Sequence, residues 1–307
     1  MEDSGLVLTL KPMTQAVAQP EKLCGERALM YRLYLPSTQN WETKMKINYK
    51  NIIVPDKPGW KICNVDLVSA EMLTLALICE CPSMLDMLSN GEDLHNKVAC
   101  IAFNTTPDKV TKQQRNASKV VNYLTNYGGS SWILQQSIIK SVGLDLPEEE
   151  CQRIMDARFE VWPEIPAWWE STFKKLEEGI FLTNLTGRCK PFFARRWEER
   201  RGQLVRNAKL EKNARAWVNQ STVADITKLA QIRLCQKEVE TKGELFNFLM
   251  ETHDSLTVQY KPGHEKEIHA IMQECFDIEL DAGWTKYIIP ISMEVGPNYG
   301  EVKEYKI

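Results

Sequence analysis

Two cations and two aromatic residues recur at intervals of four between residues 115 and 128. They are Arg115, Lys119, Tyr123 and Tyr127. In a helix, such positions lie along one side and drift by about 40° at each step. The cations suit phosphate oxygens, and an aromatic ring can stack on a base. The pattern therefore fits a helix that binds a nucleoside triphosphate. On spacing alone, a solvated basic helix end followed by core aromatics is the commoner arrangement.

Two aspartates stand where strands are predicted to end. Residues 60–65 have the pattern of a buried strand that delivers Asp66 at its end. Asp254 lies near the turn between two short predicted strands, residues 245–251 and 256–260. A strand holds such a residue in place while the adjoining loop exposes it. Either aspartate alone would be an ordinary turn residue, so the prediction of a site depends on the two acting together.

The rest of the chain shows helical patterns and short strands. Helices are predicted over residues 69–78, 115–128, 130–142, 165–178, 216–236 and 264–279, with others starting near residues 95 and 148. A hairpin is predicted over residues 182–193, with Gly187 in its turn, and a closing strand over residues 287–291. Residues 29–35 are compatible with one short strand, and no function is assigned to residues 1–48.

The composition is that of a soluble globular protein with one large domain or two modest ones. The chain has 307 residues, of which 43% are hydrophobic and 26% charged. A net charge of −3 gives no support to nucleic-acid binding by itself. However, residues 188–215 contain ten Lys and Arg against three Glu. A local basic surface can bind phosphate whatever the overall charge.

The cysteines and the apolar segments indicate an intracellular chain. Nine cysteines are present, none of them in a CxxC pattern, and Cys79 and Cys81 are too close in sequence for a usual zinc pair. No signal peptide is evident, and no apolar run nears the roughly 20 residues of a membrane span. We expect reduced thiols, no membrane association and a cytoplasmic location, which would be the host cytoplasm for a viral protein.

Three separated blocks resemble family A DNA polymerases, the family of bacterial polymerase I and related phage enzymes. Asp66 followed five residues later by Glu71 is similar to their first palm motif. The helix with Arg115 and Lys119 resembles the O helix of their fingers, and Thr252-His253-Asp254 resembles their last palm motif. The connecting segments 90–95, 220–225 and 296–300 are similar to the GEDxH element, the QGTAAD helix and a phage-type tail. The blocks follow the family's order over residues 50–300.

The resemblance implies an α+β fold. It would consist of a polymerase palm, an antiparallel sheet with helices, and an inserted, mostly helical fingers subdomain. The palm would comprise residues 49–80 and 214–307, and the fingers residues 81–213. Residues 1–48 would be a segment of uncertain structure. No thumb and no exonuclease domain are expected in this chain. It would then be a fragment or the catalytic subunit of a split polymerase, with a second polypeptide supplying the thumb, the exonuclease or both.

The resemblance also implies template-directed addition of deoxynucleotides to a primer 3′-end by two Mg²⁺ ions, with Mn²⁺ as a substitute. Asp66, Asp254 and the Leu67 carbonyl would hold the metal, because Mg²⁺ prefers oxygen ligands. Arg115, Lys119 and His95 would bind the phosphates of the incoming deoxynucleoside triphosphate.

Six further residues, together with Glu71, would contact the sugar, the template base or the primer-template DNA. Tyr123 would lie against the sugar, Tyr127 near the template base, and Glu71 would leave no room for a ribose 2′-hydroxyl. Gln220 and His253 would contact the primer end in the minor groove. The weaker DNA-contact candidates are Arg188 and Lys212, for which a solvated charged surface is an equal alternative.

Three residues depart from the family pattern and keep other functions open. Ser255 replaces the usual Glu, and His-Asp-Ser is typical of related single-subunit RNA polymerases. Leu73 replaces an Arg, and Ala216 replaces an Asn. The alternatives are a degenerate, non-catalytic DNA-binding or scaffold module and a ribonucleotide polymerase. Glu71 and the segment at 90–95 favour DNA synthesis over the second of these.

Overall fold

A five-stranded antiparallel sheet forms one side of the molecule in the computed structural model, which describes residues 48–306. The strand considered for residues 29–35 lies outside the described residues. The strand order is β11-β10-β1-β7-β6. These strands are β1 (Lys61–Leu67), β6 (Phe246–Thr252), β7 (Ser255–Tyr260), β10 (Ile291–Gly296) and β11 (Lys303–Glu304). The sheet begins after a short 3-10 helix, η3 (Tyr49–Ile52).

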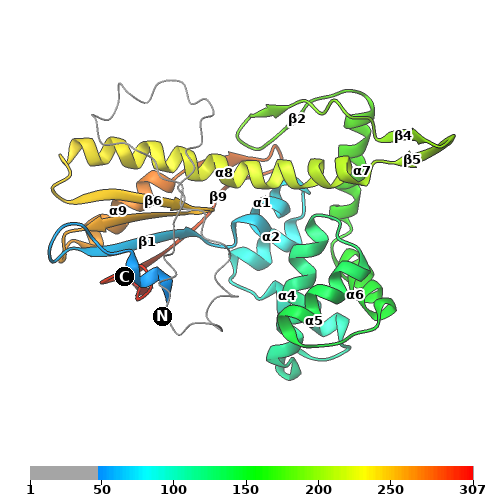
Figure 1. Cartoon of the computed structure of the whole chain (residues 1–307), viewed down its shortest axis with the longest axis horizontal. Coiled ribbons are helices and arrows are strands. Elements are labelled where there is room, and N and C mark those ends of the chain that lie inside the picture. Colours follow the sequence, from blue (N-terminus) through cyan, green and yellow to red (C-terminus); the bar gives the residue numbers. More distant parts are fainter. Residues whose placement is uncertain (1–47, 307) are drawn as a thin grey trace, which may run out of the picture.

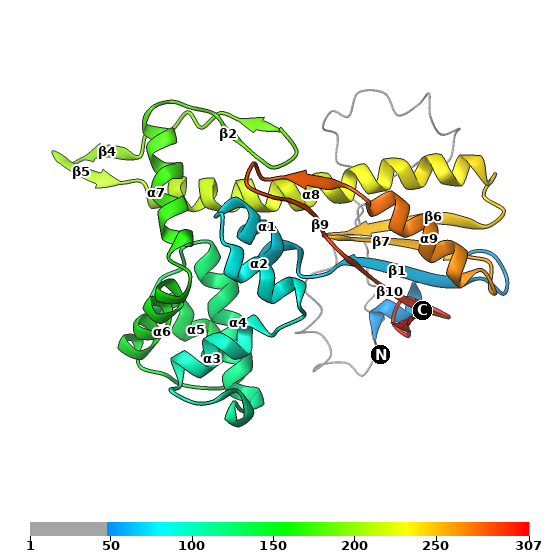
Figure 2. The same ribbon diagram turned by 180° about the vertical axis from the view of Figure 1, so that it is seen from behind.

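Strand β1 lies at the centre of this sheet. It pairs with β7 on one side and β10 on the other, so that Asp66 lies opposite Ser255 and Ser292. Residues 62–65 are buried, as a strand covered on both faces requires. Helix α9 (Glu265–Phe276) and the C-terminal half of the long helix α8 pack on the sheet and on each other (Figures 1 and 2).

Helix α8 (Ala208–Glu240) joins the sheet to the other half of the molecule (Figure 1). Its 33 residues span about 50 Å. The helix begins eight residues before the predicted start at 216, because the Asn207 side chain caps it by accepting the Leu210 N–H at 3.0 Å. Its C-terminal half contributes Ile226 and Leu234 to the main core, and its N-terminal half contributes Ala214 and Val218 to a smaller one.

A group of helices lies beside the sheet and is joined to it through α1 and α8 (Figure 2). These are α1 (Ala70–Ile78), α2 (Pro82–Ser89), α3 (Leu94–Ala102), α4 (Lys112–Asn126), α5 (Ser131–Val142), α6 (Glu148–Val161) and α7 (Glu164–Glu177), with a 3-10 turn, η4 (Pro107–Lys109), before α4. The predicted helices are all present. Helix α2 was not predicted, because its eight residues are too few for a clear helical period.

Three small hairpins complete the fold. They are β2 (Leu182–Thr183) with β3 (Cys189–Lys190), β4 (Trp197–Arg200) with β5 (Gln203–Arg206), and β8 (Glu279–Asp281) with β9 (Lys286–Ile288). The first confirms the predicted hairpin, with Gly187 at φ +86° in its turn. The second was not predicted, and projects from the molecule (Figure 1). The predicted single closing strand at 287–291 is wrong, because Pro290 lacks an N–H and separates two strands, β9 and β10, that belong to different sheets.

None of the helices between residues 48 and 306 is both long and apolar enough to cross a membrane. The cysteines within that range are free thiols.

Candidate active site

The carboxylates of Asp66 and Asp254 meet at one end of the sheet, where β1 ends and β6 turns into β7. Asp66 is the penultimate residue of β1, and Asp254 lies in the two-residue turn between β6 and β7. His253, the other turn residue, has φ +52°, which makes the turn tight. The Leu67 N–H donates to the Asp254 carbonyl at 3.2 Å and ties the turn to β1. Sheet pairing thus joins two aspartates that are far apart in sequence.

The proximity of the two carboxylates changes the chemistry of Asp66. Burial, the charge of Asp254 and a hydrogen bond with Asp254 raise the pKa of Asp66 to about 7, and Glu294 on β10 adds to the effect. Because a second carboxylate lies this close, Asp66 keeps its proton up to about pH 7 when no cation lies between the two. A divalent cation could take the place of that proton.

The donor atoms at this end of the sheet are those of a hard-cation site. Asp66, Asp254 and the carbonyl of Leu67 at the end of β1 offer oxygen only, which suits Mg²⁺ or Mn²⁺ better than zinc. Among residues 48–306, no group of three His, Cys, Asp or Glu side chains is placed to hold a metal ion. A cation here would therefore keep most of its coordination positions for water or phosphate oxygens.

The raised pKa of Asp66 predicts a pH-dependent stability. Between pH 3.8, its ordinary pKa, and about pH 7, the folded chain holds a proton that the unfolded chain has released. This contribution to the free energy of unfolding is therefore full at low pH and is lost as pH rises through 7. We expect MgCl₂ to offset the loss above pH 7 and to release about one proton per chain near pH 6, which calorimetry in buffers of different ionisation enthalpy measures. An Asp66→Asn variant with the same pH slope and proton release would contradict this origin.

Helix α4 carries the predicted cations and aromatics as expected. Its buried side includes Ala117, Val121 and Asn122, so Arg115 and Lys119 lie exposed on the opposite side. Tyr123 is 37% exposed and follows them along this surface. The helix prediction is confirmed, although α4 ends at Asn126.

The end of α4 is fixed by a glycine. Tyr127 is the C-cap of the helix, and Gly128 follows at φ +68°. The guanidinium of Arg215, on α8, lies so close to Gly128 that a side chain at this position would overlap it. The positive φ at this position favours glycine, and any side chain here would have to displace the Arg215 guanidinium.

A cavity of about 390 Å³ opens between the start of α1, the N-terminus of α3 and α4. It is lined by Ser69, Met72, Leu88, Gly91, Glu92, Asp93, Leu94, His95, Arg115 and Tyr123. Tyr123 lines this cavity and is also within electrostatic reach of the carboxylates. Burial and the charges of Glu71, Asp254 and Asp66 raise the pKa of its hydroxyl. A larger cavity of about 560 Å³ lies on α6 with Glu149, Asp156 and Glu160 in its lining, which suits a triphosphate poorly.

Arg115 forms an ion pair with Asp93, a residue that the sequence interpretation did not select. Asp93 also caps α3, because its side chain accepts the N–H groups of His95 at 2.9 Å and Asn96 at 3.2 Å. Partial burial acts to raise the pKa of Asp93, but the hydrogen bond from Arg115 and those of the cap outweigh it and lower the pKa. Lys119 has no ion-pair partner among the described residues, so it remains the freer cation of the two.

Glu71 lies beside Tyr127 and within electrostatic reach of Asp254. Burial raises the pKa of Glu71, and nearby Tyr127 lowers it in part. Burial and the Glu71 carboxylate hold the pKa of the Tyr127 hydroxyl well above its usual range, against an opposing effect of Gln220. That hydroxyl is buried without a hydrogen bond of ordinary geometry to any described residue. From α8, Asn219 donates to the Glu71 carbonyl at 3.0 Å and anchors the start of α1.

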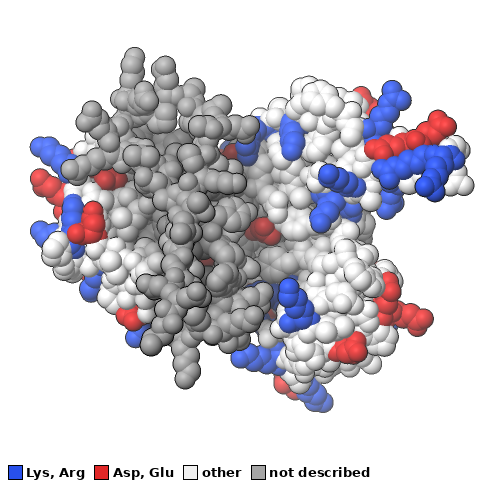
Figure 3. Space-filling model, viewed as in Figure 1, with Lys and Arg blue, Asp and Glu red and all other residues white. Residues whose placement is uncertain are grey.

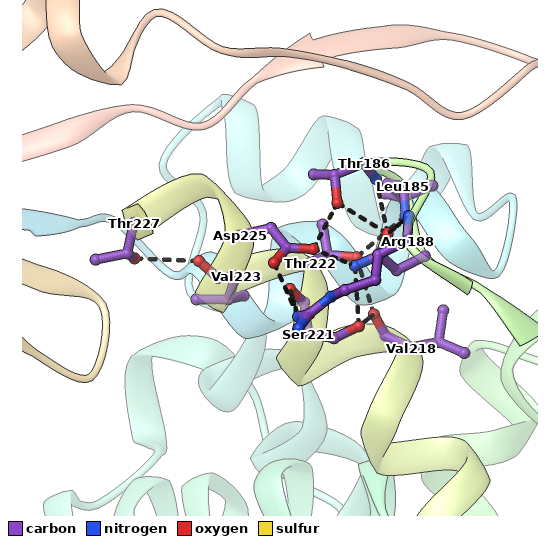
Figure 4. Close-up of polar contacts among 10 residues, drawn as sticks. Leu185, Thr186, Arg188, Val218, Ser221, Thr222, Val223, Asp225 and Thr227 are labelled. Carbon is purple, nitrogen blue, oxygen red and sulfur yellow. Dashed lines mark hydrogen bonds and ion pairs between the residues drawn. The ribbon is translucent and has the colours of Figure 1, made fainter. Parts of the chain in front are cut away.

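The weaker DNA-contact candidates lie around α8. Arg188 pairs with Asp225 at 2.8 Å and donates to the Ser221 carbonyl at 3.2 Å, so it fastens the β2–β3 turn to α8 (Figure 4). Half of its side chain remains exposed. Lys212, the other weaker candidate, is exposed on α8. Gln220 on α8 and His253 in the β6–β7 turn, the two residues expected at the primer end, are exposed as well.

The basic segment 188–215 is less basic as a surface than its composition suggests. Three of its arginines converge on one buried carboxylate, Glu211, on α8: Arg196, Arg206 and Arg215. Acidic side chains also stand beside arginines on the projecting β4–β5 hairpin (Figure 3). The segment serves partly to hold the hairpin to α8.

Two of the departures from the expected pattern have structural roles. Ser255 is buried, and its hydroxyl donates to the Thr252 carbonyl at 3.0 Å, which closes the β6–β7 turn beside Asp254. Leu73 is buried in the main core on α1. For Ala216, which is partly exposed on α8, the contacts of the described residues offer no structural reason.

A sequence comparison decides the family. The profile of DNA polymerase family A matches residues 34–301. The chain belongs to DNA polymerase family A. This family A chain is 27% identical over 241 residues to the thermostable DNA polymerase I of Thermus thermophilus, covering 78% of this chain and 26% of the relative. It is 24% identical over 273 residues to DNA polymerase I of Geobacillus stearothermophilus, covering 87% and 29%.

The family A chain spans about a quarter of the length of these curated relatives. A solved structure of the POL domain of Pol1 from M. smegmatis, in complex with a DNA primer-template and dNTP, superposes with a TM-score of 0.67 at 22% identity. The match covers 82% of this chain and 42% of that one. The mixed helical and antiparallel-sheet fold is thus that of a family A polymerase domain.

Proposed function

We propose that this chain is the palm and fingers portion of a template-directed DNA polymerase that adds deoxynucleotides to a primer 3′-end. The palm comprises residues 49–80 and 214–307, and the fingers residues 81–213. The observation that carries the proposal is the pairing of Asp66 with Asp254 at the end of the sheet, within electrostatic reach of Tyr123 on α4. The family relatives named DNA polymerase I support it.

In this proposal the two carboxylates and the Leu67 carbonyl hold Mg²⁺, or Mn²⁺ as a substitute. When bound, two such ions would activate the primer 3′-hydroxyl and neutralise the leaving pyrophosphate. Arg115 and Lys119 position the triphosphate, because this chemistry depends on orientation and charge neutralisation. Arg115 must then exchange Asp93 for a phosphate oxygen, while the freer Lys119 needs no exchange.

The nucleotide and the DNA lie between α4, α1 and α8 in this proposal. Tyr123 contacts the sugar, Tyr127 lies near the template base, and Glu71 occupies the space of a 2′-hydroxyl. Gln220 on α8 and His253 in the β6–β7 turn contact the primer end. Arg188 and Lys212 make weaker contacts with the DNA.

We further propose that a second polypeptide supplies thumb or exonuclease functions, and that the chain acts in the cytoplasm, where its substrates are found. Phosphate contacts supply most of the affinity of a protein for duplex DNA. The expected consequence is short extension products by the chain alone and longer products with its partner. Equal product lengths in the two cases would count against the partner.

The deciding experiment is primer extension with deoxynucleotides or ribonucleotides, in MgCl₂ or MnCl₂, by the wild type and by Asp254→Ala. Extension with deoxynucleotides that Asp254→Ala abolishes supports the proposal. No extension under any metal or partner condition indicates a degenerate DNA-binding module. A preference for ribonucleotides indicates an RNA polymerase.

Glu71 gives a separate prediction on sugar selection. A Glu71→Ala variant is expected to raise the kcat/KM for ribonucleotides relative to deoxynucleotides by about 10- to 100-fold, because a pocket that only excludes a hydroxyl provides about this much discrimination. Steady-state incorporation of ATP against dATP measures the ratio. Glu71→Gln keeps the volume of the side chain and serves as the control, with selection expected to stay within about threefold of the wild type. Unchanged selection in Glu71→Ala would assign discrimination to another residue.

A further inference from the structure

A fully buried arginine lies beneath the candidate nucleotide cavity. Arg158, on α6, has no exposed surface. Its Nε donates to Oδ1 of Asn122 at 2.8 Å, and its Nη2 donates to Oδ1 of Asn126. Both asparagines lie on the buried side of α4. Burial lowers the pKa of Arg158 to about 9, which leaves the guanidinium protonated at neutral pH. Arg158 therefore acts only as a hydrogen-bond donor.

This contact determines which way the Asn122 amide points. Because Arg158 can only donate, the Asn122 oxygen must face it, and the Asn122 nitrogen must face the other way. That nitrogen lies 2.8 Å from Nδ1 of His95. An amide nitrogen also only donates, so Nδ1 of His95 must accept and carries no proton. The neutral imidazole then has its proton on Nε2.

His95 faces the cavity between α3 and α4. It lines this cavity together with Arg115 and Tyr123, and its ring centroid lies 5.9 Å from that of Tyr123. Nε2 has no hydrogen-bond partner among residues 48–306. Burial and the cations Arg115, Lys119 and Arg158 lower the pKa of His95 to about 4, although Asp93 acts in the opposite direction. The ring is thus a neutral donor beside two permanent cations.

We propose that Arg158 is a positioning residue that acts through Asn122 to hold His95 in the Nε2–H tautomer, so that His95 donates a hydrogen bond to an oxygen of a bound nucleoside triphosphate. The ligand in this statement rests on the proposed function, whereas the tautomer rests on the free chain alone. His95 thereby contributes direction rather than charge. The single Nε2–H group can donate only to an oxygen that lies along its N–H bond. The charges of Arg115 and Lys119, in contrast, attract the triphosphate from any direction.

The tautomer is tested by ¹⁵N NMR of the whole labelled chain at pH 7.5. The chain has four histidines, and a His95→Gln spectrum identifies the signals of His95. We expect Nε2 of His95 to be protonated and Nδ1 to be unprotonated. Asn122→Asp keeps an oxygen for Arg158 but also presents an oxygen to Nδ1, and should therefore protonate Nδ1. A protonated Nδ1 in the wild type, or an unprotonated one in Asn122→Asp, would overturn the proposal.

The role of Arg158 itself is tested by Arg158→Met, with circular dichroism to check folding. Without the donor, the Asn122 amide can turn over, so the Nδ1 and Nε2 signals of His95 should move toward averaged positions. A folded Arg158→Met with an unchanged spectrum would remove Arg158 from the proposal. If this variant does not fold, the wild-type and Asn122→Asp spectra still decide the tautomer.

A binding measurement tests the donor role without requiring turnover. In His95→Gln the amide nitrogen can take the place of Nε2, whereas in His95→Asn it lies nearer the place of Nδ1. By equilibrium dialysis of labelled dATP with CaCl₂, we expect His95→Gln to stay within about threefold of the wild-type Kd and His95→Asn to raise it about tenfold. Equal losses in both variants would overturn the donor role. No binding of dATP to the wild type would instead contradict the proposed function and leave the tautomer to the NMR result.

Discussion

An Asp254→Asn variant is expected to lose primer extension by at least about 1,000-fold while keeping its fold. Asp254 and Asp66 are the two carboxylates at the end of the sheet, and the amide removes one of the two negative charges proposed to hold Mg²⁺ without changing the volume. Stabilisation of charge as it develops in phosphoryl transfer is worth several kcal/mol per group, which corresponds to this loss. Single-nucleotide extension under saturating dATP and MgCl₂ measures the change in kcat.

Stability measurements separate loss of chemistry from loss of structure in that variant. Removing the Asp254 charge relieves Asp66, so the metal-free variant is expected to be as stable as the wild type at pH 5 and more stable at pH 8, by about 1 kcal/mol after allowance for solvent screening. Asp145→Asn, at an exposed position, is the matched control and should change neither activity nor stability. Full activity in Asp254→Asn would remove the carboxylate pair from the mechanism.

A Glu211→Gln variant is expected to lower the free energy of unfolding by about 3–5 kcal/mol, the usual cost of breaking a buried ion pair. Glu211 is 1% exposed. One of its carboxylate oxygens accepts a hydrogen bond from Nε of Arg196 at 2.8 Å, and its second oxygen lies 3.2 Å from Nε of Arg206. Arg215 lies 3.9 Å from the same oxygen and stacks over Trp169. A glutamine would turn an N–H group toward at least one of these guanidinium groups. Urea denaturation followed by far-UV circular dichroism measures the loss.

The control for Glu211 is an ion pair of the same chemistry on the surface. Glu178 and Lys174 form an exposed i,i+4 pair at 3.9 Å near the end of α7. Glu178→Gln is expected to change the free energy of unfolding by less than about 0.5 kcal/mol, since exposed pairs of this kind contribute little. If the two substitutions lowered the free energy of unfolding equally, the buried contacts of Glu211 with the three arginines would stabilise the fold no more than an exposed ion pair does.

The elements that sequence alone predicted were those with a clear period or a strong turn signal. Helix α4 followed from its spacing, and β1 from a run of buried residues that delivers Asp66. The β4–β5 hairpin was missed because its strands, Trp197–Arg200 and Gln203–Arg206, are mostly exposed and show no alternation. Its stability comes from the turn at Arg201 and Gly202, with φ +54° and +74°, and from the arginines that reach Glu211.

The candidate site was predicted in its residue types but not in its contacts. Asp66, Arg115 and Tyr123 could be selected because each belongs to a recognisable block. The residues that hold the site, Asp93 and Arg158 among them, are ordinary capping and helix residues in sequence. Their partners lie on other helices, so only the packing of α3, α4 and α6 brings them into the site. The cap position of Asp93 before α3 was the one signal available in advance.

During synthesis, β1 leaves the ribosome long before either strand that pairs with it. Helices α1 to α7 make mainly contacts between neighbours in sequence and can pack early, whereas β1 must wait for β7 and β10. Until Ser255–Tyr260 has been made, the apolar residues of Lys61–Leu67 have no strand to pair with, and Ile291–Gly296 completes the other side later still. The carboxylate pair therefore cannot form before the β6–β7 hairpin has been made, and a product truncated ahead of it leaves the apolar β1 without a partner strand and open to chaperones and proteases.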